Sequence, residues 1–172
     1  ARTPEPAQFT GPTMGTTYHV TVSGADASHE RRAVQAAIDQ VLVETERHLS
    51  TYHVTSEIAL LNRDESRSWQ DVSPTLFVVL QEAHDVSVLT GGSFDVTVAP
   101  LLELWGHKPD SSGVSGRMTF QPPTSDQLKQ AHKSVGYARL ELRSVPRLLV
   151  RKSASGMRLT VDGIAPGYAV DR

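Results

Sequence analysis

The segment over residues 162–171, DGIAPGYAVD, contains the residue types in this chain best suited to binding phosphate. An apolar, strand-like run over residues 157–161 leads into a turn of small residues, and the turn leads into a predicted helix start. Free backbone N–H groups and the positive end of a helix dipole favour anions at such a position. The pattern therefore predicts a turn where the phosphates of a ligand approach the backbone.

Three other clusters place polar, sulfur-containing or aromatic side chains between predicted elements. They span residues 13–16, 50–58 and 91–106. Each residue also has an ordinary structural interpretation: Met14 suits a core, Tyr52 the edge of a core, and Asp95 a helix cap. Taken singly, these residues leave the choice between a structural role and a binding role open.

Composition limits the classes of protein that remain. The 172 residues are enough for one domain with a real core, and 38% hydrophobic with 21% charged residues indicates a folded chain. A net charge of −2 gives no electrostatic basis for binding nucleic acid or an anionic membrane. An aromatic content of 6% disfavours a platform for stacking single-stranded bases. The sequence therefore predicts no nucleic-acid partner.

The absence of cysteine removes several kinds of chemistry. Disulfides, thiolate metal sites and a thiol nucleophile are excluded. The seven histidines show no close ligand spacing, so the sequence predicts no zinc site. No apolar run approaches the length of a membrane span. The start at Ala1, followed by Pro4 and Pro6, is typical of a mature or trimmed N-terminus.

The first half of the chain predicts a strand and three helices. Residues 1–12 form a Pro-rich lead-in, and alternation over residues 16–22 indicates a half-buried strand. Residues 30–49 have a helical apolar stripe, with Ser28 as the predicted N-cap and Glu46 away from the stripe. A short helix follows at residues 56–62. Another helix begins at Ser73-Pro74 and ends at Gly91-Gly92.

The second half predicts a loop, a helix and several strands. Residues 107–125 are rich in Pro, Gly and Ser and form a long surface loop. A helix runs over residues 125–135 and ends at Gly136. The predicted β-like runs are residues 139–142, 147–151 and 158–161. The whole pattern predicts an α+β fold, with mixed or antiparallel sheet layers flanked by helices.

Considered together, the clusters resemble the FAD:protein FMN transferase family, long labelled thiamine-biosynthesis lipoproteins. The matching pieces are residues 13–16, 49–52, 56–58 with Asn62, 91–100, 104–106, 135–137 and 164–172. The resemblance covers essentially all of this chain but only about the first half of a typical family member. It implies that residues 13–172 are the N-terminal part of a flavin transferase domain, with the C-terminal half absent.

The resemblance implies a magnesium-dependent transfer. The family binds FAD, cleaves its pyrophosphate, moves FMN onto a Thr or Ser hydroxyl of a target flavoprotein and releases AMP. Phosphoryl transfer of this kind depends on positioning and on charge neutralisation by the metal. A turn of small residues suits the pyrophosphate, and the side chains of Met14 and Tyr52 suit the flat face of a flavin or adenine.

Site residues follow from the resemblance, position by position. The implied FAD contacts are Met14, Tyr52, Ser93, Phe94, Asp95, Asp162 and Tyr168. The implied ligand for Mg²⁺ is the backbone carbonyl of Ala165, a hard oxygen donor that suits this ion. Catalytic residues cannot be placed, because the family's second half supplies Asp and Thr ligands and a His near the reacting groups.

Departures from the family pattern leave alternatives open. Pro166 stands where many family members have Lys, and proline supplies no positive charge for phosphate. A chain of only these residues is expected to be catalytically inactive. The alternatives are an FAD-binding or flavoprotein-assembly protein without turnover, and an FAD pyrophosphatase that uses water as acceptor. Family members are usually exported and often lipid-anchored, which implies a periplasmic or envelope location, although this chain lacks the N-terminal Cys that carries the anchor.

Overall fold

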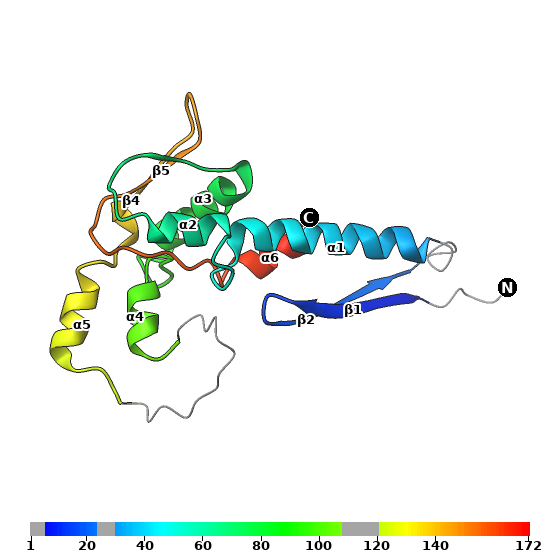
Figure 1. Ribbon diagram of the computed structural model, residues 1–172, viewed down its shortest axis with the longest axis horizontal. Coiled ribbons are helices and arrows are strands. Elements are labelled where there is room, and N and C mark those ends of the chain that lie inside the picture. Colours follow the sequence, from blue (N-terminus) through cyan, green and yellow to red (C-terminus); the bar gives the residue numbers. More distant parts are fainter. Residues whose placement is uncertain (1–5, 24–29, 108–120) are drawn as a thin grey trace.

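One long helix connects two parts of the molecule in the computed structural model, which describes residues 6–23, 30–107 and 121–172 (Figure 1). Helix α1 (Arg31–Leu49) packs lengthwise against a hairpin of β1 (Ala7–Thr13) and β2 (Thr16–Val22), from its first turn to Glu46 near its C-terminal end. The C-terminal half of α1 also contacts α2 (Glu57–Arg63), α3 (Pro74–Leu89) and α6 (Ala165–Val170). The strand predicted at residues 16–22 is confirmed as β2.

The hairpin also corrects one expectation. The Pro-rich lead-in predicted for residues 1–12 forms strand β1 over Ala7–Thr13, which pairs antiparallel with β2. Ala7 and Phe9 are buried against α1 side chains, and this burial outweighs the low strand propensity of Gly11 and Pro12. A two-stranded ribbon leaves one side of each strand unpaired, and proline is tolerated there.

The larger part of the molecule is built around a second sheet. Its three antiparallel strands lie in the order β3 (Gln70–Asp71), β5 (Leu149–Lys152) and β4 (Leu140–Arg143). The main core gathers residues of α2, α3, β4, β5 and the segment over residues 157–161. The remaining elements are α4 (Ala99–Leu104), α5 (Ser125–His132) and the 3₁₀ turn η1 (Tyr137–Arg139). Helices beside antiparallel sheets confirm the predicted α+β class.

Helix ends mostly follow the predicted capping residues. Ser73 accepts a hydrogen bond from the N–H of Leu76 and is followed by proline, as predicted for the start of α3. Gly91, with a φ of 59°, lies just beyond the end of this helix and adopts the left-handed conformation expected there. Ser28 lies outside the described residues, as does most of the predicted loop over residues 107–125.

One predicted strand was wrong, and three short elements were not predicted. The run over residues 158–161 is not a strand: it makes only the single bridge from Arg158 to Val98. Met157, Leu159 and Val161 are buried, so the alternating pattern is real, but the Asn62 side chain takes the place of a neighbouring strand. Helices α4 and η1 and strand β3 were missed, because each is too short to show a clear period.

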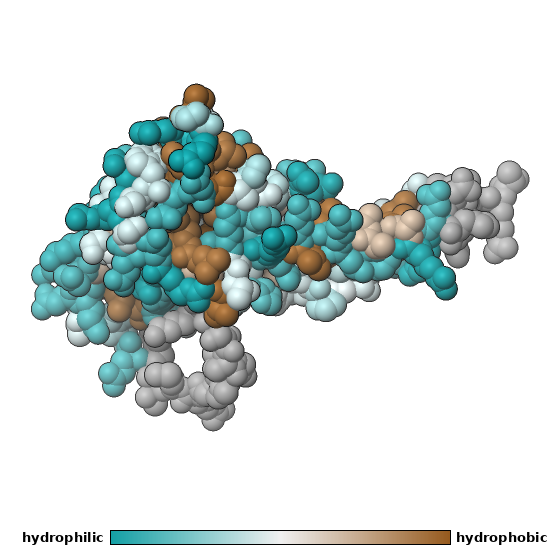
Figure 2. All heavy atoms as spheres, turned by 45° about the horizontal axis from the view of Figure 1, so that its top comes forward, coloured by the Kyte–Doolittle hydropathy of each residue, from teal (hydrophilic) through white to brown (hydrophobic). Residues whose placement is uncertain are grey.

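Hydrophobic side chains are also exposed on several parts of the surface (Figure 2). A groove of about 760 Å³ runs between the hairpin, α1 and α6, and its lining includes Val20, Ile38, Val41 and Val170. Within the described residues, no helix is long and apolar enough to cross a membrane.

Lys152 joins the sheet to the C-terminal end of α2. The residue is only 5% exposed, and its ammonium donates hydrogen bonds to the carbonyls of Leu61 (2.5 Å), Asn62 (3.3 Å) and Asp64 (2.8 Å). These carbonyls lie at the negative end of the helix dipole, where a cation is favourable. Burial lowers the pKa of Lys152, and the charge of Asp64 partly opposes this effect.

We predict that Lys152→Met lowers the free energy of unfolding by about 1.5–3 kcal/mol, because buried carbonyls lose a charged donor. Urea denaturation followed by circular dichroism measures this loss. Lys129→Met is the matched control, since its side chain is 76% exposed in an ion pair within α5, and it should cost under about 0.5 kcal/mol. Equal costs for the two variants would contradict the capping role.

Candidate functional site

A pocket of about 90 Å³ lies where the hairpin tip, the C-terminal end of α1, the α1–α2 loop and the start of α6 meet. Four residues with predicted roles line it: Met14, Tyr52, Asp162 and Ala165. They come from segments far apart in the sequence, so the fold has brought them together. The other residues that line the pocket are Thr45, Glu46, Leu49, Ser50 and Pro166.

Met14 forms the tip of the β1–β2 hairpin. Thr13 pairs with Thr16, so Met14 and Gly15 make a two-residue turn, with φ angles of 48° and 74°. A left-handed backbone costs about 1–2 kcal/mol for a residue with a Cβ atom. The N–H of Met14 donates a 2.9 Å hydrogen bond to Oε1 of Glu46, which ties the turn to α1.

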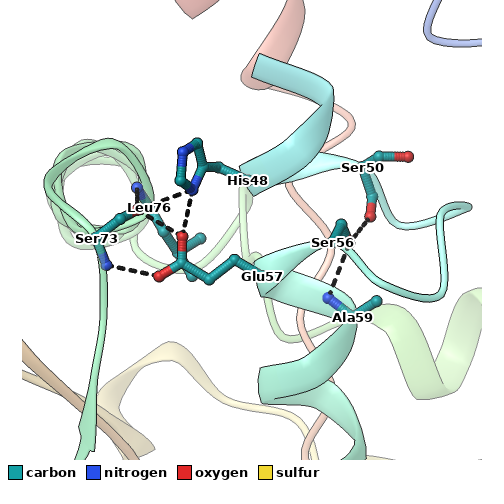
Figure 3. Close-up of polar contacts among 7 residues, drawn as sticks. All are labelled: His48, Ser50, Ser56, Glu57, Ala59, Ser73 and Leu76. Carbon is teal, nitrogen blue, oxygen red and sulfur yellow. Dashed lines mark hydrogen bonds and ion pairs between the residues drawn. The ribbon is translucent and has the colours of Figure 1, made fainter. Parts of the chain in front are cut away.

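The α1–α2 loop holds Tyr52 by hydrogen bonds around two serines. Oγ of Ser50 accepts bonds from the N–H groups of Tyr52 (3.3 Å) and His53 (3.2 Å). The Ser56 hydroxyl donates to the carbonyl of Ser50 (2.5 Å) and accepts from the N–H of Ala59 at the start of α2 (Figure 3). The loop is thus fixed at both ends, while Tyr52 itself is 51% exposed and leaves ring surface for a ligand.

The terminal turn is tied to the same loop. The Thr51 hydroxyl donates a 2.9 Å hydrogen bond to Oδ1 of Asp162. Upstream, the Asn62 side-chain amide donates to the carbonyl of Leu159 (2.8 Å), and its oxygen accepts from the N–H of Leu159 (2.7 Å). The carbonyl of Val161 accepts from the N–H of Ala165 (2.8 Å). These bonds set the position of Asp162 and Ala165 relative to α1 and α2.

Asp95 has a structural part in the neighbouring loop. Its Oδ1 accepts bonds from the N–H (2.8 Å) and hydroxyl (2.6 Å) of Thr97, and its Oδ2 accepts from the N–H of Tyr137 (2.9 Å). The Thr97 hydroxyl in turn accepts from the N–H of Gly136 (2.7 Å). Asp95 therefore joins the loop before α4 to η1, and it does not line the pocket.

The remaining predicted contacts do not line the pocket. Phe94 lies against the terminal turn, because a Cβ atom added to Gly163 would come within 3.3 Å of the Phe94 ring. Ser93 is exposed on the same loop. Tyr168 lines a separate small hollow with Val41, Glu44, Thr45, Thr75 and Arg172. The fold thus gathers four of the eight predicted residues in one pocket and leaves Ser93, Phe94, Asp95 and Tyr168 outside its lining.

The sequence analysis did not predict a role in the site for two residues, Glu46 and Thr51. Glu46 was expected away from the buried stripe of α1, yet its carboxylate faces the hairpin tip and lines the pocket. Thr51 was noted only as part of a motif, and the structure gives it the bond to Asp162. A helical spacing of four residues between Glu46 and Ser50 is the one sequence signal that places Glu46 near the loop.

A second polar cluster, formed by His48, Glu57 and Ser73, connects three helices (Figure 3). Nδ1 of His48 lies 2.6 Å from Oε2 of Glu57 and 3.1 Å from Oγ of Ser73. A serine nucleophile needs one ring nitrogen facing the serine and the other facing the acid. Here both contacts use the same nitrogen, and Ser73 also caps α3. The cluster therefore links α1, α2 and α3 and does not form a nucleophilic triad.

Comparison with known proteins identifies the family. The chain belongs to the ApbE family, whose sequence model matches residues 14–172. The FAD:protein FMN transferase of Vibrio cholerae is 31% identical over 167 residues, which are 97% of this chain and 47% of that protein. The FAD:protein FMN transferase of Haemophilus influenzae is 28% identical and is matched over 46% of its length.

Solved structures of the family share the fold. Flavin transferase ApbE from Vibrio cholerae superimposes with a TM-score of 0.85 at 30% identity, covering 97% of this chain and 51% of that chain. The apo form of the Pseudomonas stutzeri flavinyl transferase ApbE gives a TM-score of 0.83 at 27% identity. The predicted flavin transferase fold is confirmed, and the chain spans about half the length of the relatives that it matches.

We predict that Asp95→Ala lowers the free energy of unfolding by about 1.5–3 kcal/mol, because Thr97 and Tyr137 lose a charged acceptor. Urea denaturation measures the effect. Asp71→Ala is the control: its carboxylate is 61% exposed and pairs with Arg147, so the cost should stay below about 1 kcal/mol. If Asp95→Ala were no more destabilising than the control, the structural role assigned to Asp95 would be wrong.

Proposed function

We propose that this chain provides the FAD-binding part of a flavin transferase, which moves FMN from FAD onto a Thr or Ser hydroxyl of a target flavoprotein and releases AMP. The convergence of Met14, Tyr52, Asp162 and Ala165 on one pocket carries the proposal. Membership of the ApbE family supports it, since the relatives bear the name FAD:protein FMN transferase.

The side chains of the pocket suit a dinucleotide with a flat ring system. The half-exposed ring of Tyr52 offers a face for stacking, and the thioether of Met14 is a polarisable contact for an aromatic ring. The carboxylate of Asp162 accepts hydrogen bonds from ring N–H or hydroxyl groups. Asp162 also lines an adjoining cavity of about 160 Å³ with Thr51 and Asn62, so a long ligand has room to extend past the bridge from Thr51 to Asp162.

Magnesium dependence belongs to the same proposal. The carbonyl of Ala165 and the carboxylate of Asp162 are hard oxygen donors beside one pocket, and Mg²⁺ is commonly bound by one or two carboxylates together with substrate phosphates. These residues fit part of such a site. Among the described residues, no group of three or more His, Asp or Glu side chains forms a complete one. The ion would neutralise charge on the diphosphate of FAD.

A second candidate function has a specific observation in its favour. Pro166 lines the pocket, and proline contributes neither a backbone N–H nor a charge for phosphate. A protein that binds FAD without turnover, or one that hydrolyses FAD with water, would tolerate this residue. An envelope location, by a lipid anchor or by export, follows only from the resemblance and forms part of the leading proposal.

A transfer assay separates the three functions. The full-length flavin transferase that contains these residues is incubated with FAD, Mg²⁺ and a target flavoprotein domain, and products are followed by in-gel flavin fluorescence and by chromatography of nucleotides. We expect covalent flavin on the target together with AMP. AMP and free FMN without labelled target would indicate a pyrophosphatase, and bound FAD without AMP would indicate a binding or assembly protein.

We predict that Tyr52→Ala raises the Kd for FAD about three- to tenfold, because the loss of an aromatic stacking partner costs about 0.5–1.5 kcal/mol. Quenching of flavin fluorescence measures the Kd. Val54→Ala is the control on the same loop, since Val54 is 57% exposed and lies outside the pocket lining. A Kd that does not change in Tyr52→Ala would remove this ring from the binding site.

A further inference from the structure

Glu46 is the residue that fixes the hairpin tip to α1. Its Oε1 accepts two hydrogen bonds, from the N–H of Met14 (2.9 Å) and from the hydroxyl of Thr13 (3.1 Å). The side chain is 27% exposed, so water competes only partly for these bonds. Hydrogen bonds to an ionised acceptor are also stronger than bonds between neutral groups.

The base of this anchor is rigid. Glu46 lies on α1 next to Thr45 and three residues before Leu49, and both neighbours are 2% exposed. The Thr45 hydroxyl also donates to the carbonyl of Val41 one turn back, at 2.8 Å. A carboxylate that projects from a packed helix holds its partner more accurately than one on a loop.

Met14 needs such an anchor because of its backbone. Two-residue hairpin turns with positive φ at both positions strongly prefer Asn, Asp or Gly, yet Met14 occupies the first position with a φ of 48°. A non-glycine residue persists in this conformation only when its surroundings hold it there. The retained side chain faces the pocket, which gives a reason for methionine at a position where glycine would be easier.

We propose that Glu46 is a positioning residue for the flavin pocket: its carboxylate holds Met14 at the hairpin tip so that the thioether contacts the bound flavin nucleotide. The inference rests on the proposed function, because that function supplies the ligand. Loss of the carboxylate frees the Met14 turn to relax, so the effect appears as weaker binding of FAD.

His53 offers a competing explanation for any effect of Glu46. Its Nε2 lies 3.6 Å from Oε2 of Glu46, but the His53 side chain is 65% exposed. Exposed ion pairs of this kind contribute little. The anchor and the ion pair use different oxygens of the carboxylate, so variants can separate them.

The test measures the Kd for FAD by fluorescence quenching in four variants. Glu46→Ala should raise the Kd about tenfold, and Glu46→Gln, which keeps an oxygen acceptor, should stay within about threefold. His53→Ala should stay within about twofold, because it spares the bonds to the hairpin. Glu82→Ala, an exposed acidic residue on α3, controls for the loss of one negative charge.

A double-mutant cycle with Met14→Gly tests whether Glu46 acts through Met14. Glycine removes both the thioether and the strain, so adding Glu46→Ala to this variant should change the Kd by less than about twofold. Additive effects, or a Kd that Glu46→Ala alone leaves unchanged, would overturn the proposal. A merely structural role would lower the urea midpoint and leave the Kd of the folded protein unaltered.

Amide hydrogen exchange at Met14, measured without FAD, separates this inference from the function on which it rests. Glu46→Ala should speed exchange at Met14 about tenfold relative to the unsubstituted chain, since that N–H loses its acceptor. Unchanged exchange contradicts the anchor itself. Failure of the unsubstituted chain to bind FAD contradicts the proposed function, whatever the exchange rates are.

Discussion

The position of the site depends on one amide side chain, that of Asn62. By bonding to both the N–H and the carbonyl of Leu159, it replaces the neighbouring strand that the buried segment over residues 157–161 lacks on that side. The N–H of Thr160 bonds to the carbonyl of Val96 and fixes the segment further. Residues Asp162 and Ala165 follow directly, so their place relative to α1 is set by interactions outside the pocket.

The pocket is therefore assembled from short irregular segments on rigid supports. A hairpin turn, a helix–helix loop and a turn before α6 supply residues to it. Side-chain hydrogen bonds attach the hairpin turn to α1, close the helix–helix loop at the start of α2, and tie the turn before α6 to that loop. Loops held by a firm scaffold are the usual place for binding residues. Without those attachments, Tyr52 and Met14 would be mobile and would lose conformational entropy when they met a ligand.

The elements that were predicted correctly are those marked by local sequence signals. Ser73-Pro74 and Gly91 mark helix ends through backbone chemistry that needs no tertiary contact, and the alternation in β2 is equally local. The strand predicted over residues 158–161 was wrong because alternate residues can be buried without a partner strand. Of the eight site residues that the motifs indicated, Met14, Tyr52, Asp162 and Ala165 line one pocket, whereas the other four, Asp95 among them, do not. The role of Glu46 depends on a residue 32 positions away, which no local pattern reveals.

Met14 and Pro166 line both the pocket and the apolar groove along α1, so they form a thin partition between two hollows. Proline is rigid, whereas methionine has three freely rotating side-chain bonds. Rotation of the Met14 side chain would transfer space from one hollow to the other while the backbone stays in place. The relative size of the two hollows therefore depends on the rotamer of Met14, and an unbranched thioether side chain can adopt several rotamers.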